Sequence, residues 1–124
     1  MGINSQLEIV AFNDSCTGSA APFSSCTAAN TGTCTMRITF GGTGIGGSTA
    51  VTAAHHETTN VLLGNNASTS AQTYNYNNIA SSVQNGTGTA SISTATNVNI
   101  LVTMQNSVSG DTCWLGGLNV TMIP

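Results

Sequence analysis

The stretch Thr33–Phe40 reads TCTMRITF, and apolar and polar side chains alternate along all of it. In an extended strand successive side chains point to opposite faces. The even-numbered residues would therefore form an apolar face, opposite a polar face made of Thr35, Arg37 and Thr39. This pattern predicts a strand with one face buried, and hence a sheet that is covered on one side.

Four other stretches also favour strands. Residues 7–12 (LEIVAF) have little polar interruption, which indicates a strand buried on both faces. Residues 89–94, 97–104 and 118–123 are rich in apolar and β-branched side chains, which fit a pleated sheet. The sheet is expected to contain about five strands.

Two segments between these strands match helical spacing. Residues 48–62 can be capped by Ser48 and ended by Gly64. Its apolar stripe would consist of Val51, Ala54, His55, Thr58 and Leu62. The second helix is expected over about residues 70–84, ahead of Gly86, with Tyr76, Ile79, Ala80 and Val83 on one face. A third, short helix can begin at Pro22 and cover residues 22–29, and the glycine-rich residues 41–47 are expected to form a flexible loop.

Strands at both ends with helices between them predict an α+β fold. The expected architecture is a mixed sheet layered with two or three helices (α/β/α) and stapled by disulfides. The turns do not show the even spacing expected of a β-sandwich. The chain of 124 residues fits one domain, residues 1–124.

Charge is scarce in this sequence. Only 4% of the residues are Asp, Glu, Lys or Arg, whereas about a quarter is usual for a globular protein. A chain with a single Lys or Arg cannot neutralise a phosphate backbone, which argues against nucleic acid as a partner. It also gives little attraction to an anionic membrane, and no apolar run approaches the length of a membrane span, so no membrane insertion is expected. The surface is expected to be built from amides and hydroxyls.

The four cysteines indicate an oxidising compartment. Cys16, Cys26, Cys34 and Cys113 form an even set in a short chain, which predicts two disulfides. The sequence leaves the three possible pairings open, but Cys113 must reach back to the N-terminal third. Residues 1–6 lack a basic start and an apolar core, so they do not read as a signal peptide. We expect a secreted protein in its mature form, with an added initiator Met.

The sequence offers little for catalysis or for metal binding. His55 and His56 are adjacent, whereas two histidine ligands on a helix need a spacing of four residues. Glu57 is expected on the solvent face. The chain contains no G-x-S-x-G motif, no Lys for a phosphate loop and only four acidic residues for a carboxylate pair. We therefore expect no enzyme activity, no cofactor and no metal.

Two clusters are the candidate ligand-binding residues. Trp114 directly follows Cys113, and Asp111 lies two residues before that cysteine. A disulfide at Cys113 could therefore hold the Trp114 ring beside the Asp111 carboxylate, an arrangement suited to binding a sugar. The alternative is that Trp114 packs over the disulfide. The second cluster combines rigid aromatic area with adaptable amides. It consists of Tyr74, Asn75, Tyr76, Asn77 and Asn78, and all but Asn77 are candidate ligand-binding residues. Its alternative places Tyr76 in the core and Tyr74 on the surface.

The cysteine-bearing segments resemble those of small secreted fungal proteins. Residues 7–18 (LEIVAFNDSCTG) are followed by FSSC and TGTC, and residues 113–120 (CWLGGLNV) close the chain. The loop Asp14-Ser15-Cys16-Thr17-Gly18 is one residue shorter than the Asp-x-x-Cys-x-Gly form. By size, low charge and element order the chain is similar to the ink-cap (Coprinus-type) mushroom lectins. That resemblance implies an α/β/α-layered domain, a dimer joined at sheet edges and recognition of fucosylated LacdiNAc-type glycans.

The leading expectation is a lectin that binds neutral oligosaccharides, fucosylated or GalNAc-containing ones included, without catalysis. A homodimer joined at a sheet edge, either residues 118–123 or residues 7–12, would add avidity to weak sugar sites. The alternative is a secreted toxin-like or effector-like protein that acts on a protein or a membrane. A third possibility is a subunit of an extracellular filament or adhesin.

Overall fold

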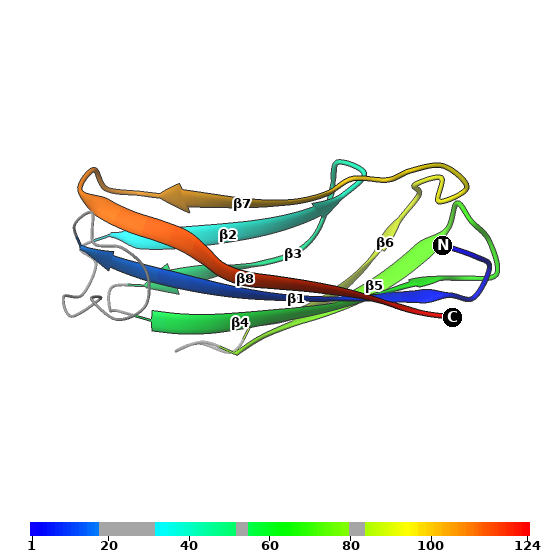
Figure 1. Ribbon diagram of the computed structural model, residues 1–124, viewed down its shortest axis with the longest axis horizontal. Helices are drawn as coiled ribbons and strands as arrows, with labels where there is room; N and C mark the ends of the chain where they lie inside the picture. The colour runs from blue at the N-terminus through cyan, green and yellow to red at the C-terminus, as the bar shows by residue number, and fades with distance from the viewer. Residues whose placement is uncertain (18–31, 52–54, 80–83) are drawn as a thin grey trace.

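The structure is a computed structural model that describes residues 1–17, 32–51, 55–79 and 84–124 (Figure 1). Its described residues form eight strands in two antiparallel sheets and no helix. The larger sheet has the order β6 (Gln84–Ala90), β5 (Gln72–Ile79), β4 (His55–Asn65), β1 (Gln6–Thr17), β8 (Asp111–Ile123). The smaller sheet has the order β3 (Thr43–Val51), β2 (Thr33–Phe40), β7 (Ile100–Asn106).

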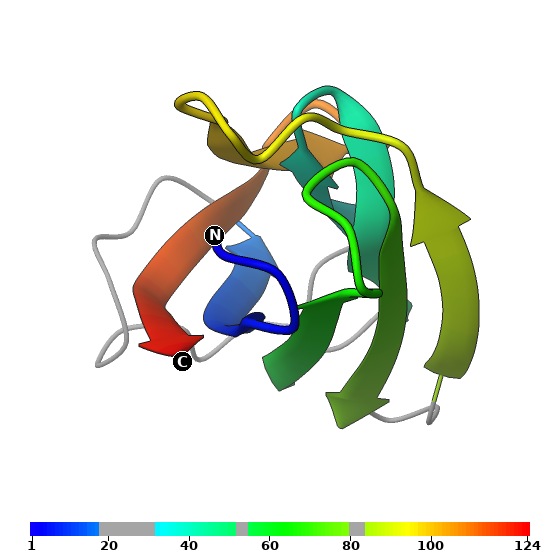
Figure 2. The same ribbon diagram turned by 90° about the vertical axis from the view of Figure 1, so that its right-hand side faces the viewer.

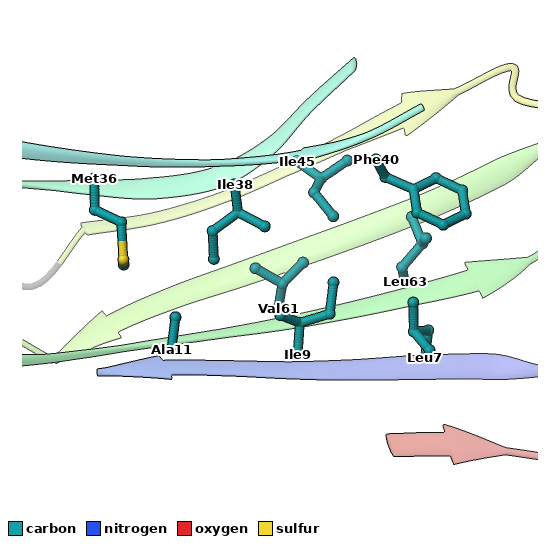
Figure 3. Close-up of a cluster of buried hydrophobic side chains, with 9 residues drawn as sticks. All are labelled: Leu7, Ile9, Ala11, Met36, Ile38, Phe40, Ile45, Val61 and Leu63. Atoms are coloured by element: carbon teal, nitrogen blue, oxygen red, sulfur yellow. The ribbon is translucent and has the colours of Figure 1, made fainter. Parts of the chain in front are cut away.

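The two sheets face each other as layers of a sandwich. Seen along the strands, the five-stranded sheet curls around the three-stranded one (Figure 2). The core lies between them and is made of nine side chains that point toward one another from both sheets (Figure 3). These side chains are Leu7, Ile9, Ala11, Met36, Ile38, Phe40, Ile45, Val61 and Leu63.

The expected α+β fold is therefore wrong, and so is the statement that the chain lacks the pattern of a sandwich. The segment expected as a helix over residues 48–62 spans the end of β3 and most of β4. Buried residues in β4 recur at every second position, from Glu57 to Asn65, which is the period of a strand. The β-branched threonines and valine of this segment lose side-chain freedom in a helix and fit a pleated sheet.

The second expected helix, over about residues 70–84, is also a strand. It contains β5, in which Tyr74 and Tyr76 share the inner face while the asparagines at 75 and 77 lie on the outer face. Tyr and Asn alternate here with a period of two, which is the period of a strand. This pattern is a better guide to the structure than the weaker match to helical spacing. The expected glycine loop is instead the hairpin between β2 and β3, turned at Gly41 and Gly42, which both have a positive φ.

Most of the predicted strands are confirmed, with shifted ends. Thr33–Phe40 is β2, and its even-numbered residues are buried as expected. The strand at residues 7–12 lies in β1, but its outer face is not buried, because Phe12 is exposed. The strand expected over residues 97–104 is β7, which begins at Ile100, and residues 118–123 are the second half of β8. The strand expected over residues 89–94 is mostly wrong, because β6 ends at Ala90 and residues 91–94 lie in no strand. The short helix expected over residues 22–29 lies outside the described residues.

Glycines in β6 make room for the two tyrosines of β5. The register pairs Gly86 with Tyr76 and Gly88 with Tyr74. A Cβ added at Gly86 would lie 2.4 Å from Tyr76 Cε1, and one added at Gly88 would lie 2.4 Å from the Tyr74 hydroxyl. The rings thus lie over bare backbone, a known way to support a glycine in a strand.

We expect Gly86→Ala to lower the free energy of unfolding by about 1–3 kcal/mol, because the added methyl group must displace the Tyr76 ring. Gly64→Ala is the matched control, since its Cβ would meet nothing nearer than Gln6 Cγ at 3.6 Å. Urea denaturation of both variants measures the difference. Equal stability of the two variants would show that the ring is not held over Gly86.

Candidate functional site

The outer face of the five-stranded sheet is polar over four of its strands. Directly opposite residues in an antiparallel sheet share a face, so the register assigns this face strand by strand. Its polar members, here called the outer amide face, are Gln6 and Glu8 of β1, Thr58 and Asn60 of β4, Thr73, Asn75 and Asn77 of β5, and Asn85, Thr87 and Thr89 of β6. The side chains are amides and hydroxyls with one carboxylate, which suits a neutral polar ligand.

Two adjoining hollows lie on the outer amide face. The first has a volume of about 510 Å³ and is bordered by β1, β4, β5 and β6. The second has a volume of about 270 Å³ and is bordered by β1, β4 and β5. Leu62 and Asn75 line both hollows. Asn75 therefore stands at the junction of the hollows, where its amide can donate to and accept from the same ligand.

The Glu8 carboxylate on this face is held in place by a neighbour. Asn60 Nδ2 donates a hydrogen bond to Glu8 Oε1 across the β1–β4 pair at 3.1 Å. Both residues border the second hollow. The second carboxylate oxygen keeps its capacity to accept hydrogen bonds, and a fixed carboxylate can take a pair of adjacent hydroxyls.

Two aromatic residues belong to the same outer face beyond the hollows. The register places Phe12 of β1 opposite Gly117 of β8, and Asp14 opposite Trp114. Phe12 is 45% exposed, and its ring lies close to Gly117, where an added Cβ would meet Phe12 Cδ2 at 3.3 Å. An exposed ring beside amides offers a stacking surface for the C–H bonds of a pyranose.

The predicted cluster at residues 74–78 is divided between the two faces of the sheet. Asn75 is exposed on the outer face, as a binding residue requires. Tyr74 and Tyr76 point inward and pack against the core. Asn78 is buried between the sheets and its side chain makes no hydrogen bond. Successive residues of a strand alternate faces, so the five residues cannot act as one site.

Asn78 belongs to a buried polar cluster at one end of the sandwich. Its neighbours on the inner face are Asn13, Glu57 and Thr59, all nearly inaccessible to solvent. Asn13 Nδ2 donates to Glu57 Oε2 at 3.2 Å. The expectation that Glu57 lies on the solvent face is therefore wrong. Glu57 is an inner-face residue of β4, two positions before Thr59.

The predicted pair of Asp111 and Trp114 is also separated. Asp111 is buried, and its Oδ2 accepts a hydrogen bond from the backbone N–H of Gly32 at 2.7 Å. Its carboxylate thus ties the start of β8 to the residue before β2. Trp114 is partly buried, and its Nε1 is enclosed without a hydrogen-bond partner. Asp111 is a structural residue, and Trp114 offers an outer-face ring without an exposed donor.

One of the predicted disulfides is confirmed. Cys34 of β2 and Cys113 of β8 are joined, with their Cα atoms 5.8 Å apart. Cys113 thus reaches back to the N-terminal third, as the sequence required, and the bond links the two sheets. Cys26 lies outside the described residues, and Cys16 is described only as a backbone position in β1.

Metal ligands do not gather in the described part of the chain. Within residues 1–17, 32–51, 55–79 and 84–124, no group of three or more His, Cys, Asp or Glu side chains could hold a metal ion. In the same residues no helix is long and apolar enough to cross a membrane.

Sequence reasoning missed most of the outer amide face. The missed residues include Asn60, which lies in an expected helix, and Glu8 and Phe12, which lie in the strand expected to be buried on both faces. Gln6, just before that strand, was also missed. The signal was present in residues 73–77, where polar residues recur at every second position. Comparison with known proteins does not add to this assignment, since no family model, no curated protein and no solved structure matches the chain.

Proposed function

We propose that this is a secreted carbohydrate-binding protein that holds a neutral glycan on the outer amide face, without catalysis. The observation that carries the proposal is the pair of adjoining hollows lined by amides and hydroxyls, with Asn75 at their junction. A glycan ring presents hydroxyls that donate and accept, and neutral amide and hydroxyl side chains match it. Among the described residues that border the two hollows, Glu8 alone is charged. The disulfide between Cys34 and Cys113 fits an extracellular site of action.

The binding mode follows from the arrangement on the face. Adjacent hollows can hold adjacent sugar units, with Asn75 contacting both. Glu8, held by Asn60, accepts from a pair of hydroxyls in the second hollow. Phe12, exposed on the same face, stacks on a sugar that extends toward β8. Fucosylated and GalNAc-containing oligosaccharides are the first ligands to test.

The oxidised protein on a broad glycan array provides the test, with Asn75→Ala beside the wild type. We expect binding to one class of neutral glycan, and about a tenfold loss in the variant, because a lost amide removes hydrogen bonds to two sugar units. Asn99→Ala is the matched control, an exposed amide that precedes β7 in the other sheet and should bind as the wild type does.

Further variants locate the aromatic contact. Phe12→Ala should weaken binding if its ring stacks on the glycan, whereas Trp114→Ala should do so only if the partly buried indole also contacts it. A blank array with the folded wild-type protein would reject the proposal. Toxicity that free sugars do not compete with would instead favour the toxin-like or effector-like alternative.

A further inference from the structure

The second half of β8 is an apolar edge that the sandwich leaves uncovered. β8 ends the five-stranded sheet, so one side of it has no strand partner among the described residues. Opposite β1, the register places Leu118, Val120 and Met122 on the inner face with Ala11, Ile9 and Leu7. The three residues of β1 are buried, whereas those of β8 are 45%, 41% and 56% exposed.

The exposure has a topological cause. Among the described residues the facing sheet has three strands and ends at β7, so none of the described strands lies over this part of β8. A hollow of about 310 Å³ opens here between the sheets, lined by apolar side chains that include Phe40, Ile100, Val120 and Met122. The Cys34–Cys113 bond holds the start of β8 to the smaller sheet, while the end of the strand runs along β1 (Figure 1).

This edge lacks the features that normally prevent strands from pairing. Proteins protect exposed edges with charged side chains, prolines or bulges. Residues 112–123 contain no charged residue and no proline, and the irregularity in the register against β1 lies before Leu118. The other end of the same sheet, β6, has the sequence QNGTGTA and offers no comparable row of apolar side chains.

The segment is complementary to itself in an antiparallel arrangement. If Val120 lies opposite Val120 of a second copy, Leu118 lies opposite Met122 and Asn119 lies opposite Thr121. Every inner-face pair is then apolar and every outer-face pair is polar, and no like charges meet. A second copy necessarily carries the same complementary pattern, whereas a strand of another protein would match it only by coincidence. Two-fold symmetry is also the commonest symmetry of oligomers.

We propose that two copies of the chain pair through residues 118–122 of β8, antiparallel and centred on Val120, to form one continuous ten-stranded sheet. The pairing satisfies the free backbone edge and packs the exposed inner-face side chains of the two copies side by side. The outer amide faces of both copies then lie on the same side of the joined sheet. The pairing rests on β8 alone and does not depend on what the outer amide face binds.

The mass of the protein in solution tests the pairing. We expect light scattering after gel filtration to give about 25 kDa, twice the chain mass of 12.5 kDa. Five paired residues make a small interface, so the measurement should span about 1–500 µM. Val120→Lys should give a monomer at every concentration, because it places two ammonium groups at the two-fold axis. A wild-type protein that stays at 12.5 kDa would overturn the proposal and leave this edge to a strand of a different protein.

Cysteine cross-linking tests the register even if the lysine variant does not fold. Under mild oxidation Val120→Cys should form a covalent dimer, since directly opposite residues bring their Cα atoms to about 4.5–5.5 Å, within disulfide range. Thr121→Cys is the matched control, because the proposed register places it opposite Asn119 and not opposite itself. Cross-linking of Thr121→Cys with none of Val120→Cys would overturn the register.

Discussion

Replacing both Cys34 and Cys113 with alanine is expected to lower the free energy of unfolding by about 4.5 kcal/mol. The bond closes a loop of 79 residues, and the chain-entropy relation gives this value for that length. Cys34 is also completely buried, so the change removes packing at the point where β8 meets the smaller sheet. The total stability of a domain this size is about 5–15 kcal/mol, so the loss is a large share of it.

Guanidinium denaturation of the double variant and of the wild type measures this difference. Both proteins retain Cys16 and Cys26, so the comparison isolates the bond between the sheets. Cys34→Ser with Cys113→Ser serves as a second pair that tests whether the result depends on the replacement. A loss of less than about 1 kcal/mol would mean that β8 is held mainly by its pairing with β1.

Ile38→Ala is expected to cost about 2–5 kcal/mol, the usual range for such a truncation in a core. Ile38 lies in the central strand of the smaller sheet, is fully buried and points at the side chains of the facing sheet (Figure 3). Among the described residues the three-stranded sheet supplies four buried side chains to the core cluster, and partly buried side chains of β7 pack against it, so truncation of Ile38 leaves a space inside a packed core.

Leu101→Ala is the matched control for this truncation. It removes the same number of carbon atoms from the neighbouring strand β7, at a position opposite Thr39 where the side chain is largely exposed. We expect a change within about 0.5 kcal/mol, as is usual for surface substitutions. Thermal melting of both variants measures the difference in stability. If Leu101→Ala destabilises the protein as much as Ile38→Ala does, the Leu101 side chain is buried by a contact that is absent from the monomer.

Local sequence was a reliable guide where one period was unambiguous. Thr33–Phe40 was predicted with its ends and its buried face, because four apolar residues alternate with four polar ones. It failed in residues 48–62, where threonines and alanines fit two periods at once. Val51 and Leu62 can share a helical stripe, yet in the fold they lie in different strands, β3 and β4.

The same ambiguity determined how much of the site could be found. Asn75 was predicted as a binding residue together with Asn78, and the structure separates them, because Asn75 is exposed and Asn78 lies on the buried face. Glu8 lies in the apolar run of residues 7–12, and a strand buried on both faces would not present it to a ligand, so the sequence does not indicate it as a binding residue. The partners that make the hollows come from β1, β4, β5 and β6, and no local pattern indicates which strands are adjacent.

The sequence by itself determined the neutral surface, the oxidised cysteines and the long reach of Cys113, because these follow from residue type and from chain connectivity. Only the tertiary structure decided that β1 lies between β4 and β8, that the smaller sheet ends at β7, and that residues 118–122 therefore remain uncovered. The physical reason is that strand order depends on contacts between residues far apart in the chain. A periodic pattern shows which face of a strand is apolar, but not which strand will cover it.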